Sequence, residues 1–192
     1  MPEETLRMPQ PKTFALVLAA LFACASSAQS PTDGHIAGKS YVNPYFHIAY
    51  SWPAILNPMA LPTSSATSSP SAYAFPLFTA RQGDQPYGVV VVAEKLNVAG
   101  PHSAGIKSSS EYIDRIEHTL RPGPILSNIA RSQKKNSHGV VFDMLNYQQN
   151  GKPSSVIATQ AGNYLIVFKC NAQSAADMVQ MENSALALRS LK

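Results

Sequence analysis

The chain has 192 residues, of which 45% are hydrophobic and 14% are charged, and its formal net charge is +4. Typical globular chains are about 25% charged, and this hydrophobic content supports a packed core, so the composition excludes a disordered acidic or basic protein. The length suits one ordinary domain with a short N-terminal extension.

The N-terminus is typical of an export signal. The apolar stretch TFALVLAALFA at 13–23 is too short to span a bilayer and suits the hydrophobic region of a signal peptide. Ser26 and Ala28 are small residues at the positions that a cleavage after Ala28 requires, so we expect residues 1–28 to be a signal peptide. The acidic residues that precede Met8 are unusual in a signal, which favours Met8 as the true start.

Cys24 offers an alternative. Leu21, Ala23 and Cys24 match a bacterial lipobox, in which Cys24 would carry a lipid that tethers the protein to a membrane. Simple cleavage is favoured because Phe22 is bulky for its lipobox position. Both alternatives predict an exported protein, in the periplasm or outside a bacterium. After cleavage only Cys170 remains, so no internal disulfide is expected.

The exported part is expected to contain one domain. Residues 29–40 are polar and contain glycine, which predicts a flexible linker. The single domain is expected to span 41–192.

The segment YVNPYFHIAYSWP at 41–53 begins this domain. Phe46, Ile48 and Tyr50 recur at period two, which predicts a strand with one strongly apolar face. Pro53 cannot donate to a β-ladder, so this strand is expected to stop near Trp52. We expect these aromatic and aliphatic side chains, with Trp52, to anchor the core rather than to border an active site.

A long loop and a pair of strands are predicted next. Residues 53–72 are rich in proline and serine, which indicates the loop. YAFPLFTA at 73–80 and YGVVVVAEKL at 87–96 predict two strands joined by a short turn. Pro76 predicts that the first is an edge or irregular strand, and the run of valines predicts that the second is central and covered on both faces.

Two helices are predicted from their start and stop signals. Ser108 and Glu111 form a capping box before apolar residues at helical spacing, and this helix is expected to end at Pro122. Ser174 and Asp177 indicate the start of a second helix near the C-terminus.

An antiparallel meander is predicted between the helices. Asn150-Gly151 between two strand patterns is a strong hairpin signal. The densest basic segment, RSQKKNSH at 131–138, is expected to be a solvated turn rather than a polyanion site, so no nucleic-acid partner is predicted. The expected strands are 125–131, 139–149, 154–160 and 164–170.

NPYFHIAYSWP at 43–53 resembles the opening of PsbP-like domains, which are named after an extrinsic protein of the photosynthetic oxygen-evolving complex. This chain has Ile55 and Leu56 where such domains often carry a further tryptophan. The resemblance implies a PsbP-like arrangement of 41–192 and a non-catalytic accessory or binding module, and it transfers no site residues. The element order by itself predicts the α+β class, with two main helices packed on an antiparallel β-sheet.

Four places in the sequence are candidates for a catalytic or ligand-binding role. His47 is expected to be a hydrogen-bonded strand histidine rather than a ligand or base. Asp114 and His118 are spaced as a solvated ion pair on a helix, although such a pair can also orient an imidazole. Cys170 ends an apolar strand and is expected to be an inert buried thiol.

Asp143 is the fourth, a charge within the otherwise apolar VVFDML. It shares its predicted face with Val141, Leu145 and Tyr147. A solvated face is favoured there, and the alternative is a paired, functional carboxylate.

These observations predict an exported, non-catalytic binding or accessory module of the bacterial cell envelope, with no catalytic, cofactor-binding or metal-binding residues. Its partner would be an envelope protein or a small ligand, and it would meet a membrane only if Cys24 were lipidated. The alternatives are a small exported hydrolase assembled from His47, Asp143 and Cys170, and a lipid-anchored structural envelope protein.

A partner is predicted to dock on the 53–72 loop and the neighbouring aromatic residues Tyr73, Phe75 and Phe78, because an edge strand and aromatic side chains favour an interface. The alternative is that these aromatic side chains point inward and the loop has no role.

Overall fold

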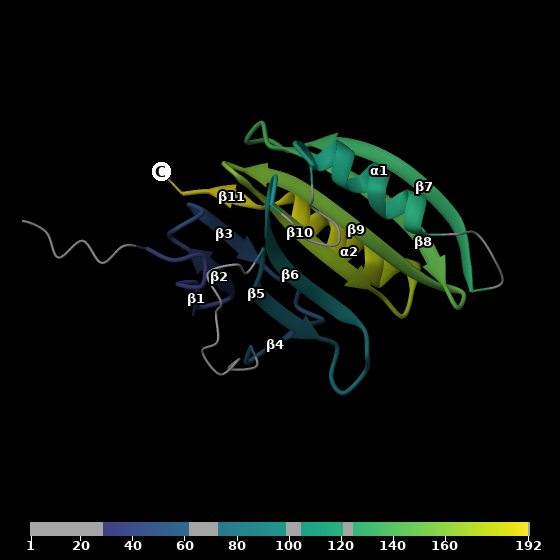
Figure 1. Ribbon diagram of the computed structural model, residues 1–192. Coiled ribbons are helices and arrows are strands. Elements are labelled where there is room, and N and C mark those ends of the chain that lie inside the picture. Colours follow the sequence, from purple (N-terminus) through teal and green to yellow (C-terminus); the bar gives the residue numbers. More distant parts are fainter. Residues whose placement is uncertain (1–28, 62–72, 99–104, 121–124, 192) are drawn as a thin grey trace, which may run out of the picture.

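Two β-sheets and two helices make up the computed structural model, which describes residues 29–61, 73–98, 105–120 and 125–191 (Figure 1). The expected signal peptide, Cys24 and residues 62–72 of the expected loop lie outside the described residues. No helix among the described residues is long and apolar enough to cross a membrane. In chain order the elements are β1 (His35–Ala37), β2 (Ser40–Asn43), β3 (Ile48–Ser51), β4 (Asn57–Met59), β5 (Ala74–Arg81), β6 (Gly88–Lys95), α1 (Ser109–Thr119), β7 (Leu126–Lys135), β8 (Val141–Gln149), β9 (Lys152–Ala161), β10 (Tyr164–Asn171), α2 (Ala175–Leu186) and β11 (Arg189–Ser190).

The larger sheet has seven strands in the order β4-β5-β6-β10-β9-β8-β7, and all its neighbours are antiparallel. The predicted meander from β7 to β10 is confirmed. Asn150 and Gly151 join β8 to β9 with φ values of 53° and 72°, the left-handed conformation that a tight hairpin requires. The strands pair antiparallel and the two helices pack on this sheet, so the fold class is α+β.

The opening segment is a hairpin and not the single strand that its period-two pattern predicted. β2 and β3 pair with each other across a turn at 44–47, and His47 adopts a positive φ of 52°. Asn43 stabilises this turn because its Oδ1 accepts a hydrogen bond of 3.1 Å from the Phe46 amide. Asn-Pro is a turn signal, and here it interrupts the strand pattern.

The hairpin belongs to a second sheet, which the sequence did not predict. Its order is β1-β2-β3-β11, so the last strand of the chain pairs with one of the first. β1 lies within 29–40, where a flexible linker was expected, and pairs with β2. β11 therefore lies beside the opening hairpin (Figure 1).

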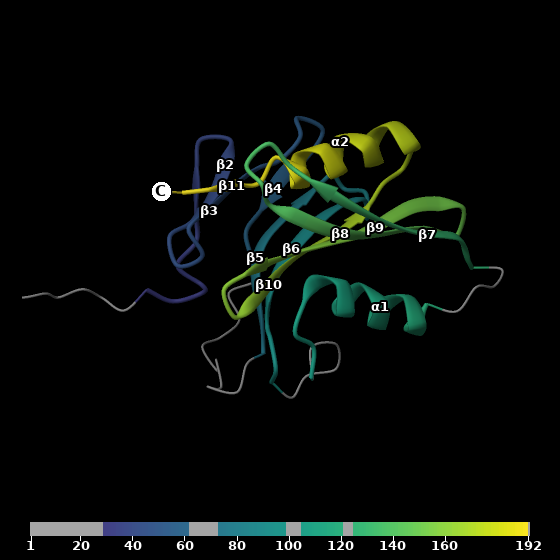
Figure 2. The same cartoon turned by 90° about the horizontal axis from the view of Figure 1, so that it is seen from above.

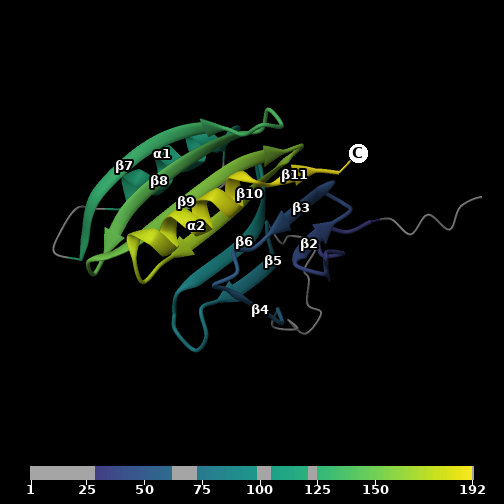
Figure 3. The same cartoon turned by 180° about the vertical axis from the view of Figure 1, so that it is seen from behind.

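The larger sheet is a central layer with a core on each face. Seen from above, α1 and α2 lie on opposite faces of it (Figure 2). One core lies under α1, and the other, larger core lies between the sheet, α2 and the smaller sheet. From behind, α2 lies across β9 and β10 next to the smaller sheet (Figure 3).

Both predicted helices are confirmed with their caps. The Ser108 hydroxyl accepts a hydrogen bond from the Glu111 amide, and Ser174 does the same for Asp177. Each cap satisfies an amide that has no partner within its helix.

Three strand predictions need correction. β4 forms at 57–59 within the expected loop and pairs with β5, so β5 is not the outermost strand. The alternative, that Pro76 makes this strand irregular, is confirmed by the register shift between Pro76 and Phe78. β7 continues to Lys135, so most of the basic segment expected as a turn is an edge strand. β6 is internal, as predicted, but only one of its faces is fully covered, because Val90 remains 40% exposed.

Candidate ligand-binding groove

The three residues of the hydrolase alternative lie in separate parts of the molecule. His47 is exposed in the β2–β3 turn, so the prediction of a strand histidine is wrong. Asp143 packs under α1 on one face of the larger sheet, while Cys170 belongs to the core on the other face. The sheet separates the carboxylate from the thiol, so these residues do not converge on one substrate.

Asp143 is buried, so the prediction of a solvated face is wrong. It is 4% exposed, and both of its carboxylate oxygens are hydrogen-bonded. Oδ2 accepts from the Ser109 hydroxyl at 2.6 Å, and Oδ1 accepts from Nε2 of Gln133 at 2.9 Å. Because Ser109 begins α1, the carboxylate also lies at the positive end of the helix dipole. Asp143 therefore anchors the helix to β8 and β7.

The surroundings of Asp114 and Cys170 also indicate structural rather than catalytic roles. Asp114 pairs with Arg131 of β7, so it does not form the pair expected with His118. Burial, and secondarily the nearby Glu182, raise the pKa of the Cys170 thiol to about 12, which keeps it neutral and unreactive. The described residues contain no group of three or more side chains that could hold a metal ion.

Glu94 is a buried carboxylate that the sequence analysis did not single out. It is 3% exposed, its Oε1 accepts a hydrogen bond of 2.9 Å from the Tyr112 hydroxyl, and Nζ of Lys169 lies 3.7 Å away. Burial and this carboxylate together raise the pKa of Tyr112. Oε2 has no hydrogen-bond partner among the described residues. Charged residues are rarely buried unless they are paired. Glu94 follows an apolar run of four valines and an alanine, and nothing in this local sequence indicated a partner for its carboxylate.

A groove lies where the two sheets meet. It consists of two adjoining hollows of about 170 Å³ and about 340 Å³, which share Phe46 and Ala161 as lining residues. The β2–β3 turn forms one wall and the β9–β10 turn, 161–164, forms the other. Below, "the groove" denotes these two hollows together.

The larger hollow has an aromatic wall. Tyr164 is the centre of it, with ring centroids 5.9 Å from Tyr45, 5.1 Å from Phe46 and 6.2 Å from Phe75. The Tyr45 hydroxyl donates to the Tyr164 hydroxyl over 3.4 Å, joining two turns that lie 119 residues apart. Partial burial, with Tyr45 as a further cause, raises the pKa of Tyr164 to about 12, so its hydroxyl is neutral and both donates and accepts.

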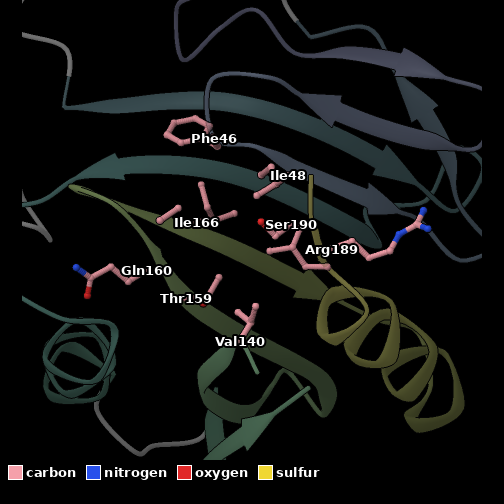
Figure 4. Close-up of a pocket in the computed structure, with 10 residues that line it drawn as sticks. Phe46, Ile48, Val140, Thr159, Gln160, Ile166, Arg189 and Ser190 are labelled. Carbon is pink, nitrogen blue, oxygen red and sulfur yellow. The ribbon is translucent and has the colours of Figure 1, made fainter. Parts of the chain in front are cut away.

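The smaller hollow is mostly apolar. Figure 4 shows Phe46, Ile48 and Ile166 on one side of it, with Val140 and Thr159 on the other. Arg189 contributes to the lining, but its guanidinium points away from the hollow. The floor is continuous with the larger core, because Phe46, Ile48 and Ile166 belong to both.

The walls of the groove are fixed by contacts outside it. The Asn43 side chain, which is fully buried, accepts from Phe46 and donates to the backbone oxygen of Pro31. The Leu191 amide donates to the His47 oxygen at 2.6 Å, which ties the C-terminal strand to the turn. These bonds hold the groove open before any ligand arrives, and a preformed site loses less conformational entropy on binding.

The opening segment therefore has two roles, where a single one was predicted. Phe46, Ile48 and Tyr50 are buried core anchors, as expected. Tyr45, Phe46 and His47 line the groove. Trp52 is only partly buried, contrary to expectation, and stacks on Phe78 with a centroid distance of 5.0 Å.

The aromatic residues of the predicted docking surface are mostly turned inward. Phe78 is 2% exposed, and Phe75 packs partly buried against the larger core beside Tyr164. This surface therefore adjoins the groove at Phe75 rather than forming a separate patch. The part of the loop at 62–72 lies outside the described residues.

The sequence matches no protein-family model and no curated protein. The structure is similar to the solution structure of cyanobacterial PsbP (CyanoP) from Synechocystis sp. PCC 6803, with a TM-score of 0.48 and 12% sequence identity, over 82% of this chain and 98% of that chain. The weak resemblance in fold that the sequence suggested is thus found, and it says nothing about what this chain binds.

Proposed function

We propose that the protein is an exported, non-catalytic binding or accessory module of the bacterial cell envelope, which holds a small ligand or part of a partner protein in the groove. The observation that carries this proposal is the groove itself: an apolar floor, an aromatic wall and a few polar groups at the rim. Small-molecule sites typically combine these features in hollows of roughly 300–1,000 Å³.

The chemistry of the lining restricts the ligand to a molecule with an apolar part. The smaller hollow would take an aliphatic or aromatic group, since Ile48 and Ile166 offer it only apolar contacts. The tyrosine hydroxyls and exposed His47 would meet the polar part of the same ligand. No acidic residue lines either hollow, which favours a neutral or anionic ligand over a cation.

The separation of three candidate residues supports this proposal over the hydrolase alternative. A hydrolase built from His47, Asp143 and Cys170 would need these residues to meet, and they lie on separate parts of the fold. A lipid-anchored structural protein would differ in its processing at Cys24, which an intact-mass measurement distinguishes.

The fluorescent dye 1-anilinonaphthalene-8-sulfonate, which is apolar with one anionic group, tests the groove directly. The purified exported chain should bind it saturably. Tyr45→Ala should weaken binding by about fivefold, because an aromatic contact contributes roughly 1 kcal/mol. Tyr147→Ala, which removes a part-buried tyrosine under α1, is the matched control and should leave the affinity unchanged. Non-saturable binding, or equal affinity in Tyr45→Ala, would refute the proposal.

A further inference from the structure

Another hollow, separate from the two that form the groove, has a volume of about 310 Å³ and lies at the other end of β9. β9 runs from Lys152 in this hollow to Ala161 in the groove, so the two sites are separated by the length of a ten-residue strand, roughly 30 Å. Below it is called the polar hollow, and the side chains used in the argument are Tyr87, Gln149, Asn150, Lys152, Ser154 and Asn171.

Three side-chain amides, from Gln149, Asn150 and Asn171, contribute to the lining of the polar hollow. Asn171 is oriented by the nearly buried Ser154, whose hydroxyl donates to its Oδ1 at 2.9 Å. This leaves the NH₂ group of Asn171 without a hydrogen bond to any described residue. The side chains of Gln149 and Asn150 and the hydroxyl of Tyr87 likewise bond to no residue in the described part of the chain.

This set of groups selects the class of ligand by its hydrogen bonding. An amide presents donors and an acceptor side by side, which matches adjacent hydroxyl groups, because each hydroxyl both donates and accepts. No carboxylate lines the polar hollow, so a divalent cation would meet only neutral oxygen ligands there and is not favoured. Lys152 is the one cation in the lining, and a single cation does not favour a polyanion.

The ring of Tyr87 adds an apolar surface to these polar groups. It is part-exposed, and its backbone oxygen accepts from the Gln82 amide at 3.0 Å, which fixes the turn that carries it. An aromatic ring joined to a polar tip suits a ligand with one apolar face and a polar edge. A pyranose ring has this shape, with C–H bonds on its face and hydroxyl groups around its edge.

We propose that the polar hollow between the β8–β9 turn and the end of β10 is a binding site for a neutral saccharide. Tyr87 contacts the face of a sugar ring, and the amides of Gln149, Asn150 and Asn171 bind its hydroxyl groups. The polar hollow is separate from the groove, so a negative result at one site does not contradict the proposal for the other.

The test uses maltotetraose, cellotetraose and chitotetraose as probes, titrated to millimolar concentration into the ¹⁵N-labelled exported chain. At least one should cause saturable shifts in the NMR signals of Asn150 and Asn171. Asn150→Gly removes an amide and keeps the left-handed backbone of the turn, at φ 53°, which glycine adopts readily. Asn150→Gly should weaken saccharide binding by about fivefold, and Tyr87→Ala should weaken it to the same extent.

Tyr45→Ala, in the groove, is the control and should leave the saccharide affinity unchanged. A melting curve for each variant separates lost binding from lost folding, and Asn150→Gly keeps the test valid if Tyr87→Ala does not fold. The proposal is overturned if no saccharide shifts the NMR signals of Asn150 and Asn171. It is also overturned if Asn150→Gly folds like the unaltered chain and binds the saccharide with the same affinity.

Discussion

Ser109 at the start of α1 donates a hydrogen bond of 2.6 Å to Asp143 in the middle of β8, joining residues 34 apart in the sequence. Gln133 of β7 donates a hydrogen bond to the other carboxylate oxygen of Asp143. One buried carboxylate thus connects the helix to two neighbouring strands at the edge of the larger sheet.

This connection predicts a measurable loss of stability on removing the carboxylate. Asp143→Ala should lower the free energy of unfolding by about 1–3 kcal/mol, because the Ser109 hydroxyl and the Gln133 amide lose their acceptor in a buried site. Chemical denaturation measures the change. Asp84→Ala, at an exposed aspartate in the β5–β6 turn, is the control and should have little effect. Equal denaturation midpoints for both variants would show that the network does not anchor α1.

Trp52 should contribute less to stability than a fully buried aromatic residue. Truncation of such a residue costs about 3–5 kcal/mol, and Trp52 is only partly buried on Phe78, so Trp52→Ala should cost about 1–3 kcal/mol. Phe168→Ala, in which the lost side chain is 0% exposed, should cost more when both are measured by denaturation. The reverse order would contradict the packing described for the opening hairpin.

The Cys170 thiol should be inert in the folded protein. Burial raises its pKa from 9.0 to about 12, so a thiol-specific reagent such as Ellman's reagent should react at pH 8 only after denaturation. The sign for stability follows from the same shift. The unfolded chain loses this proton near pH 9 and the folded chain near pH 12, so this contribution is complete below pH 9 and is lost as the pH rises toward 12.

Cys170→Ala provides the comparison for the thiol. It should reduce the fall in unfolding free energy between pH 9 and 11, because the group that ionises on unfolding is gone. Rapid labelling of the native protein at pH 8 would show instead that the thiol is accessible.

Processing should leave Gln29 as the mature N-terminus, because Ser26 and Ala28 precede an expected cleavage site. Intact-mass spectrometry of the exported protein gives the answer in one spectrum. A mass that includes an acylated Cys24 would support the lipid-anchored alternative.

Local signals in the sequence were sufficient to predict much of the fold. Ser108 and Ser174 each cap a helix within a few residues, and Asn150-Gly151 specifies its own turn, so these elements depend on near neighbours. The two-sheet arrangement could not be found this way. β11 has only two residues and exists because it pairs with β3, from the opposite end of the chain.

The groove was missed for a related physical reason. Its aromatic wall joins Tyr45 to Tyr164, and no local pattern indicates that their turns meet. The period-two alternation through Phe46 and Ile48 also concealed the turn, although Asn43-Pro44 signals one. Asp143 was misjudged because its face is covered by α1, a helix whose position over β8 depends on the tertiary fold.

The proposal that the protein binds its ligand or partner in the groove is tested most directly by site-specific photo-crosslinking in the cells that produce the protein. A photoreactive phenylalanine analogue at Ala161, which lines both hollows, should give a discrete adduct with the bound ligand or partner. The same analogue at Val179, which is 54% exposed on α2, should give none. An adduct from Ala161 that disappears when Tyr45→Ala is added is the predicted result. No adduct from Ala161, or an identical adduct from both positions, would contradict the account.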